Sequence, residues 1–153
     1  MSKKNKIIEE LYALSDDSKV LFKKKKYNVE ADKSLGVYHK DLNIIAKREK
    51  KNSKLAVELY DSGIYEAKLL CSKIFDPKDL SEDLMDLWVK DFNNWEICDS
   101  FSMKLFANSP LALKKIQEWT ASRDEFTKRA GFAIMAAYCS TNKKADNSVF
   151  KAF

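Results

Sequence analysis

Apolar residues recur along this chain at intervals of three and four positions, the spacing that puts them on one face of an α-helix. The chain holds only 3 Gly and 2 Pro, and no stretch alternates cleanly between apolar and polar residues as a half-buried strand does. Helix starts are indicated at Asp76-Pro77, before Glu82 and at Ser109-Pro110, and a helix end at Gly63. The pattern predicts an all-α fold of about eight or nine short helices, each of about ten to fifteen residues, between roughly residues 4 and 150.

One helical pattern returns at a constant offset. Residues 64–74, 95–105 and 126–136 align their large apolar positions at an offset of 31, and Trp88 and Trp119 each stand seven residues ahead of a segment. A recurring helix pair of this length is typical of an α-solenoid of HEAT-like repeats, in which neighbouring pairs cover each other's apolar faces. We therefore expect a single HEAT-like repeat domain over residues 1–153, a right-handed curved stack with a concave groove.

The same offset predicts how the domain ends. A further segment would begin at residue 157, beyond Phe153, so we expect the domain to be incomplete at its C-terminus. The apolar face around Phe132, Ile134 and Met135 would then be poorly covered.

Composition narrows the class of protein. Of the 153 residues 45% are hydrophobic and 33% charged, and no apolar run approaches the roughly 20 residues of a membrane span. No signal-peptide pattern opens the chain, so we expect a cytoplasmic protein that does not bind membranes. Cys71, Cys98 and Cys139 are widely spaced in apolar helical patterns, which predicts buried, reduced thiols. With His39 as the single histidine, we expect no metal site and no cofactor.

Charge is unevenly distributed. Residues 1–54 carry 15 Lys or Arg against 8 Asp or Glu, residues 55–99 carry 4 against 11, and residues 100–153 carry 9 against 4. The run from Lys23 to Lys26, with the basic residues between 47 and 54, has two interpretations. It either lines a phosphate-binding surface or forms a solvated helix face.

Asp99 is the first residue to explain. Within the helical pattern of residues 92–106, an apolar stripe runs along one face, made of Ile97 or Cys98, Phe101 and Leu105. Asp99 lies on the neighbouring face with Trp95, Ser102 and Phe106. An ionised carboxylate beside apolar surface is costly unless it is paired or used in chemistry. Asp99 is therefore either a functional acid or a structural one paired with Arg129 or Lys68, and Trp95 is either a functional or a core residue.

Three blocks of sequence carry a family resemblance. They are Ser-Gly-Ile-Tyr-Glu-Ala-Lys-Leu-Leu at 62–70, Phe-Asn-Asn-Trp-Glu-Ile-Cys-Asp at 92–99 and Lys-Arg-Ala-Gly-Phe-Ala at 128–133. In this order and at these separations they resemble the DNA alkylation repair enzyme family, the HEAT-like repeat DNA glycosylases, over roughly residues 35–153. The resemblance implies excision of cationic alkylpurines such as 3-methyladenine and 7-methylguanine from duplex DNA.

The resemblance also implies the site. Trp95 and Asp99 on one helix would be catalytic, and Arg129 on a later helix would bind DNA together with Lys128 and Lys68. A cationic purine is already a good leaving group, so one carboxylate that stabilises the positively charged sugar and orients a water is sufficient. We expect a monomer that needs no cofactor and whose partner is duplex DNA with alkylated bases. We expect it in the cytoplasm, and at the nucleoid when it is bound to DNA.

The residues themselves also allow two functions other than that of a DNA glycosylase. The first is a non-catalytic HEAT-repeat protein that binds DNA or another protein, with Asp99 in a structural role. The second is a helical scaffold with no role in nucleic-acid binding. Phosphate contacts make affinity fall steeply with salt, which distinguishes a DNA-binding repeat from a protein-binding one.

Overall fold

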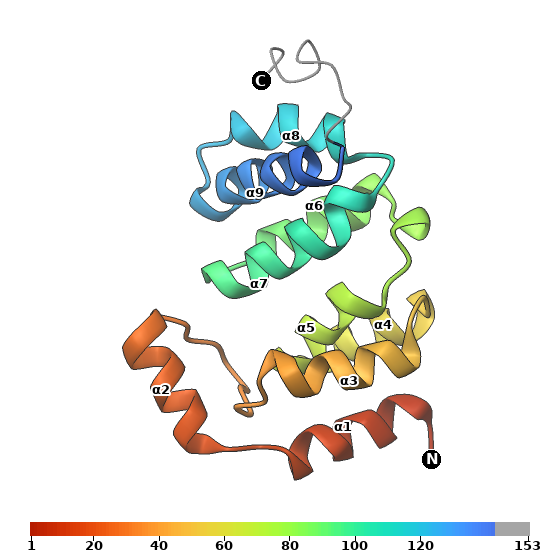
Figure 1. Cartoon of the computed structure of the whole chain (residues 1–153), viewed down its shortest axis with the longest axis vertical. Helices are drawn as coiled ribbons and strands as arrows, with labels where there is room; N and C mark the ends of the chain where they lie inside the picture. Colours follow the sequence, from red (N-terminus) through yellow and green to blue (C-terminus); the bar gives the residue numbers. More distant parts are fainter. Residues whose placement is uncertain (143–153) are drawn as a thin grey trace. The chain divides into compact units, whose positions relative to one another are not determined.

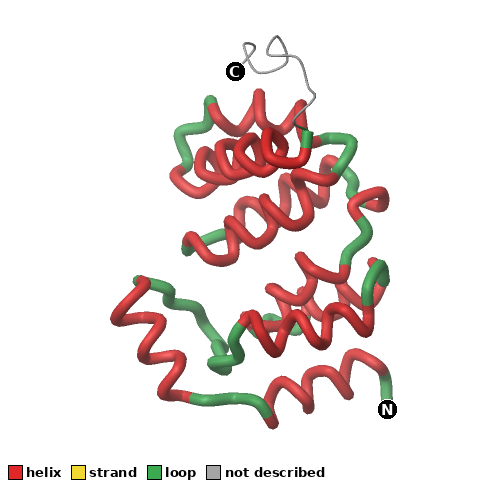
Figure 2. Tube along the Cα trace, in the orientation of Figure 1, coloured by secondary structure: helices red, strands yellow, loops and turns green. Residues whose placement is uncertain are grey.

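The computed structural model describes residues 1–142, which form nine α-helices and no strand (Figures 1 and 2). This confirms the all-α prediction for the described residues, while the part of the prediction beyond residue 142 lies outside them. None of the helices within residues 1–142 has the length and apolar character that a membrane span needs. The chain divides into two compact units, Met1–Asp76 and Pro77–Phe153.

The first unit contains five helices: α1 (Lys3–Ala13), α2 (Asp17–Tyr27), α3 (His39–Glu49), α4 (Ser53–Asp61) and α5 (Tyr65–Ile74). α4 packs along α5, and α1 and α3 cover this pair. Leu42, Leu59 and Leu69 are completely buried between these helices. The predicted helix end is confirmed, because α4 ends at Asp61 and Gly63 has the positive φ of 76° that favours glycine.

A buried carboxylate fastens the loop between α2 and α3. Glu66 on α5 is completely buried and accepts hydrogen bonds from the backbone N–H groups of Leu35, at 2.7 Å, and Gly36, at 3.1 Å. The Ser34 hydroxyl donates a third bond to it at 3.2 Å. Gly36 has a φ of 78°, and a Cβ at this position would lie 2.1 Å from the Asp16 carbonyl oxygen. The loop can therefore close on α5 only with glycine there.

The second unit contains η1 (Pro77–Asp79), α6 (Glu82–Asp91), α7 (Trp95–Ser100), η2 (Phe101–Leu105), η3 (Phe106–Asn108), α8 (Ala112–Thr120) and α9 (Glu125–Thr141). Across the chain, the first helices of the three pairs begin at residues 53, 82 and 112, and the second helices at 65, 95 and 125. These nearly constant intervals confirm the helix-pair repeat that the sequence predicts.

The core of the second unit is aromatic. The Phe101 ring lies 5.3 Å from both Trp88 and Phe92, and Phe106 lies 5.6 Å from Trp119, measured between ring centroids. Trp88 and Trp119 are 2% and 5% exposed. The two tryptophans that precede the repeated segments are therefore core residues.

The segment predicted as one regular helix over residues 92–106 is different in detail. α7 begins at Trp95 with Asn94 as its N-cap, remains α-helical to Ser100, and continues as the π-helical turn η2. In a π-turn residues five apart come into register, so Phe101 and Phe106 face each other at 5.8 Å and both are buried. Both rings therefore belong to the aromatic core of the second unit.

Three other predictions are wrong. Cys139 is exposed rather than buried, because it lies on the outer face of α9, although all three cysteines are free. The expected poorly covered apolar face is wrong for Ile134, which is completely buried, but it agrees with Phe132, which is 49% exposed. Ser109 and Pro110 form a turn, and α8 begins only at Ala112.

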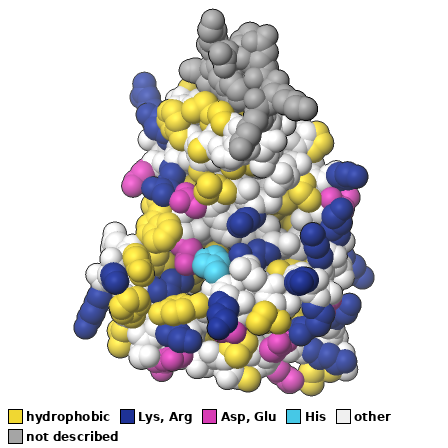
Figure 3. Space-filling model, viewed as in Figure 1, with side chains coloured by type: hydrophobic (Ala, Val, Ile, Leu, Met, Phe, Trp, Pro, Cys, Tyr) yellow, Lys and Arg dark blue, Asp and Glu magenta, His cyan; other side chains and the backbone are white. Residues whose placement is uncertain are grey.

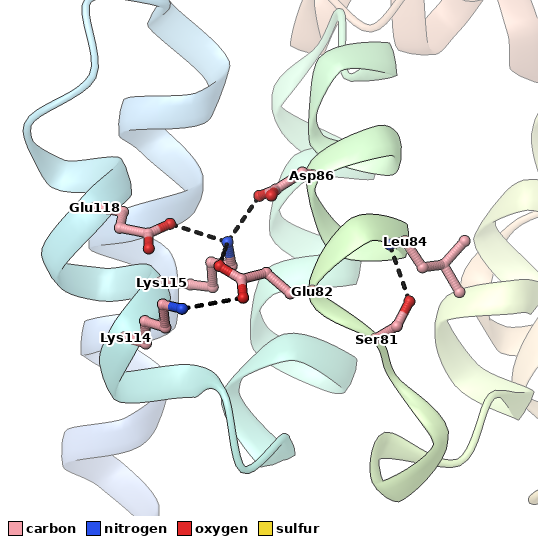
Figure 4. A network of polar contacts seen from close by, with 7 residues as sticks. All are labelled: Ser81, Glu82, Leu84, Asp86, Lys114, Lys115 and Glu118. Carbon is pink, nitrogen blue, oxygen red and sulfur yellow. Dashed lines mark hydrogen bonds and ion pairs between the residues drawn. The ribbon is translucent and has the colours of Figure 1, made fainter.

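A buried lysine connects α6 with α8. The Lys115 side chain is completely buried, and its Nζ donates to Glu82 Oε1 at 3.0 Å, Asp86 Oδ1 at 2.8 Å and Glu118 Oε2 at 2.9 Å (Figure 4). The neighbouring Lys114 donates to the other oxygen of Glu82 at 3.0 Å. Three carboxylates on two helices therefore surround the buried ammonium group of Lys115.

Candidate functional site

Asp99 and Arg129 form a two-point ion pair between α7 and α9. The Arg129 Nε–H donates to Asp99 Oδ1 at 2.8 Å, and an N–H of its Nη2 donates to Oδ2 at 2.8 Å. The side chains are 26% exposed for Asp99 and 47% for Arg129, so the pair lies at the surface. The hydrogen bonds that Arg129 donates to Asp99 raise the pKa of Arg129 more than partial burial lowers it. Of the two partners considered for Asp99, the structure pairs it with Arg129.

The pair keeps hydrogen-bonding capacity for a ligand. Each carboxylate oxygen has two lone pairs, and Arg129 engages one on each oxygen, so Asp99 can still accept hydrogen bonds from a water. A guanidinium group has five N–H donors, and two of them point to Asp99. Three donors of Arg129 remain for an anion such as a phosphate. The arrangement can therefore hold a water and an anion without breaking the ion pair.

Trp95 differs from the other two tryptophans. It is 37% exposed and stands at the first position of α7, one helical turn before Asp99. Asn94 fixes this helix start, because its side chain accepts a hydrogen bond from the Ile97 N–H at 3.1 Å. The interpretation of Trp95 as a fully buried core residue is therefore wrong. Its indole shares the accessible face of α7 with the Asp99 carboxylate.

Cys98 lies beside Asp99 but does not take part in its chemistry. It is completely buried, and its thiol donates to the Phe126 carbonyl oxygen at 3.4 Å. Burial, followed by the negative charge of Asp99, raises the pKa of Cys98 to about 12. A thiol that remains protonated at neutral pH is a poor nucleophile, so the role of Cys98 is packing.

The two predicted lysines differ in location. Lys128 is exposed on α9, immediately before Arg129. Lys68 belongs to the first unit, on α5, with its Nζ 5.0 Å from the centre of the Tyr60 ring. The structure brings together Asp99 and Arg129 within the second unit, and a groove shared with Lys68 stays a prediction.

Some features of the site were not anticipated from the sequence. The π-turn that follows α7 is one, and no residue pattern distinguishes it from a continued α-helix. The cap at Asn94 is another, although an Asn immediately before an apolar helical pattern is a recognisable signal. Within residues 1–142 there is no group of three or more His, Cys, Asp or Glu side chains placed to hold a metal ion.

The repeated helix pairs and the surface carboxylate–guanidinium pair define a helical-repeat protein with a charged site on its second helices. The family model described as "DNA alkylation repair enzyme" matches residues 7–151. The chain belongs to the DNA alkylation repair enzyme family, which confirms the resemblance found in the sequence.

A solved structure gives a second comparison. It is described as "A new family of proteins related to the HEAT-like repeat DNA glycosylases with affinity for branched DNA structures". It matches 98% of this chain with a TM-score of 0.85 and 26% sequence identity, which confirms the HEAT-like repeat fold. The match covers 64% of that protein, so this chain spans less than two thirds of its length. A search of the curated proteins gave no match.

Proposed function

We propose that this protein is a DNA glycosylase that hydrolyses the N-glycosidic bond of cationic alkylpurines, such as 3-methyladenine and 7-methylguanine, in duplex DNA. The observation that carries the proposal is the surface pair of Asp99 and Arg129 with the half-exposed Trp95 one turn away. Membership of the DNA alkylation repair family supports the same assignment.

In the proposed reaction the bond between C1′ of the sugar and the purine nitrogen breaks first. Its electron pair moves to the purine, which leaves as a neutral base, and positive charge develops on the sugar. The Asp99 carboxylate opposes this charge and accepts a hydrogen bond from the attacking water. The water oxygen bonds to C1′, and its proton passes to solvent.

Trp95 and the basic residues would position the DNA. The face of an indole attracts cations, so Trp95 would hold the charged lesion or the cationic sugar. The three remaining donors of Arg129 would bind a phosphate near the lesion while two others keep Asp99 in place. Lys128 and Lys68 would contact further phosphates.

The test is release of 7-methylguanine from methylated duplex DNA. We expect the chain to release the base and the Asp99→Asn variant to lose at least about 100-fold in rate, the effect of removing a major electrostatic stabiliser. Asp83→Asn is the matched control, because Asp83 is an exposed acid on the neighbouring helix α6. Equal rates for Asp99→Asn and the unaltered chain would contradict the proposal.

The second candidate is a DNA-binding protein without glycosylase activity. The similar solved structure is described as having affinity for branched DNA, which favours this candidate. In that case Asp99 serves to orient Arg129 toward phosphate. Binding to a three-way junction more tightly than to the matched duplex, without release of alkylated bases, would support it.

A further inference from the structure

The outer side of α2 carries large apolar side chains beside lysines. Leu21 is 57% exposed, and Phe22 and Tyr27 are each 46% exposed. Lys25 and Lys26 are exposed on the same helix. We call these five residues the α2 surface. Figure 3 shows hydrophobic side chains (yellow) and basic side chains (dark blue) next to one another in this region of the first unit, at the lower left.

The rings of the α2 surface are held in a defined arrangement. Phe22 and Tyr27 meet edge to face, with centroids 5.9 Å apart and planes at 79°. The Lys26 Nζ lies 5.3 Å from the Phe22 centroid and 5.6 Å from that of Tyr27. One ammonium group therefore stands beside two rings that are both open to solvent.

The packing of α2 does not require this surface. Lys23 is the only buried residue of the helix, and its Nζ lies 5.6 Å from the Tyr65 ring. Lys19 lies over the Tyr38 ring at 4.8 Å, and Lys24 pairs with Glu30 at 2.9 Å. Lys19 and Lys23 thus lie over rings of the first unit, whereas the side chains of the α2 surface are exposed.

The residue types fit one kind of ligand. A solvated helix face explains exposed lysines, but it does not explain two exposed aromatic rings on a helix of 11 residues. Aromatic faces next to cations are what proteins use to bind single-stranded nucleic acid, because bases stack on the rings while the cations contact phosphates. The bases of an intact duplex are stacked on each other and offer no free face.

We propose that the α2 surface binds single-stranded DNA, with Phe22 or Tyr27 stacked on an unpaired base and with Lys25 and Lys26 on the flanking phosphates. The inference rests on the proposed DNA binding but not on base excision. It gives the chain a contact for the unpaired nucleotides at a gap, flap or branch, separate from the pair formed by Asp99 and Arg129.

The experiment uses an oligonucleotide in which a duplex continues into a single-stranded tail with 2-aminopurine at an unpaired position. Stacking on an aromatic ring quenches this fluorescent base. We expect the full chain to quench it, and the double variant Phe22→Ala, Tyr27→Ala to lose the quenching and to bind the tailed DNA about 5- to 100-fold more weakly, the range expected for one stacked base. Binding to the blunt duplex should stay unchanged.

Matched variants separate stacking from charge and from folding. Ile44→Ala removes an apolar side chain that is 61% exposed on α3 in the same unit, and should leave quenching intact. Lys25→Gln should weaken binding to the tailed DNA and reduce its salt dependence, whereas Lys40→Gln on α3 should not. Circular dichroism and the melting temperature of each variant establish that it is folded.

Several outcomes would overturn the inference. Equal quenching by the chain and by the double variant would show that the rings do not stack on the base. An equal loss of affinity for tailed and blunt DNA would make α2 a general phosphate contact. Binding to anionic phospholipid vesicles that depends on Phe22 and Tyr27, without any effect on DNA, would make it a membrane contact. If the unaltered chain binds neither the tailed DNA nor the blunt duplex and releases no base, the proposed function itself fails. Base release without quenching of 2-aminopurine rejects the α2 inference alone.

Discussion

At the scale of single residues, Lys115 shows how this protein accommodates a buried charge. Burial by itself would lower the pKa of Lys115, but its hydrogen bonds to Asp86, Glu118 and Glu82 outweigh this effect and raise the pKa above 10.5, its ordinary value. The hydrogen bonds from Lys114 and Lys115 in turn lower the pKa of Glu82 below 4.5. The network therefore contributes fully to the free energy of unfolding between pH 4.5 and pH 10.5, the ordinary pKa values of Glu and Lys. The contribution is lost as pH falls through the lowered pKa of Glu82, or rises through the raised pKa of Lys115.

The first prediction concerns the variant Lys115→Met. At pH 7 the three carboxylates would repel each other without their cation, and we expect the free energy of unfolding to fall by about 2 kcal/mol. The loss is smaller than for a fully buried ion pair, because the carboxylates remain partly hydrated. Urea unfolding at pH 7 and at pH 3 measures this loss. The difference in free energy of unfolding between Lys115→Met and the unaltered chain should be smaller at pH 3 than at pH 7.

The control is Lys114→Met, since the Lys114 side chain is 54% exposed and belongs to the same network. It should cost less than about 1 kcal/mol at either pH, as exposed pairs do. A larger loss for Lys114→Met than for Lys115→Met would contradict the central role of Lys115.

At the candidate site, the sequence predicted that Asp99 is important but not which residue pairs with it. An acid beside an apolar stripe had to be paired or used, which singled out Asp99 and named Arg129 or Lys68 as its partner. The choice between the two depends on how α7 and α9 pack against each other, and no local pattern contains that information. The exposure of Trp95 was equally undetermined, because a tryptophan within an apolar helical pattern is usually buried, as Trp88 and Trp119 are.

At the scale of elements, the contact between α8 and α9 depends on a glycine. A Cβ on Gly131 would lie 2.6 Å from the backbone nitrogen of Thr120 and 2.9 Å from the carbonyl carbon of Trp119. Both atoms belong to backbone and cannot rotate away. The close approach of these two helices therefore requires a residue without a side chain at this position.

The second prediction concerns Gly131→Ala. Alanine has the higher helix propensity, by about 1 kcal/mol, and on that ground alone the variant would be more stable. We expect the opposite, a loss of about 2 kcal/mol in the free energy of unfolding, because α8 and α9 must move apart. Thermal unfolding followed by circular dichroism decides between these results, and a melting temperature above that of the unaltered chain would refute the steric argument.

The elements were largely predictable, and their ends were not. Apolar spacing and the offset of 31 indicated the helix pairs, because each pair must bury an apolar face against its neighbours and therefore repeats the same spacing of apolar residues. The π-turn η2 was missed, since the choice between a regular and a widened turn depends on whether Phe106 finds space in the core. The start of α8 was placed two residues early, because Ser109 and Pro110 form a turn that resembles a helix start in sequence.

At the scale of the whole molecule, net charge and its distribution bear on DNA binding. The chain has a formal net charge of +5, although its middle third is acidic. A positive net charge attracts any polyanion and by itself identifies no binding site. The number of phosphates that the protein contacts is a sharper quantity, because each contact releases counterions and adds about 0.9 to the slope of log affinity against log salt on duplex DNA.

The third prediction uses this slope to test the DNA-binding residues individually. If Arg129 contacts a phosphate, Arg129→Gln should reduce the slope by about 0.9, and Lys128→Gln and Lys68→Gln should each do the same if they contact phosphates as proposed. Lys90→Gln is the control, since Lys90 is an exposed lysine of α6 with no proposed contact, and should leave the slope unchanged. Fluorescence anisotropy with a labelled duplex over a series of salt concentrations gives each slope. Because Arg129 also holds Asp99, Arg129→Gln should abolish base release in addition to reducing the salt slope. The two lysine variants should retain base release at saturating DNA. A slope that is unchanged in Arg129→Gln, with base release lost, would limit Arg129 to positioning the carboxylate and would assign the phosphate contacts to other residues.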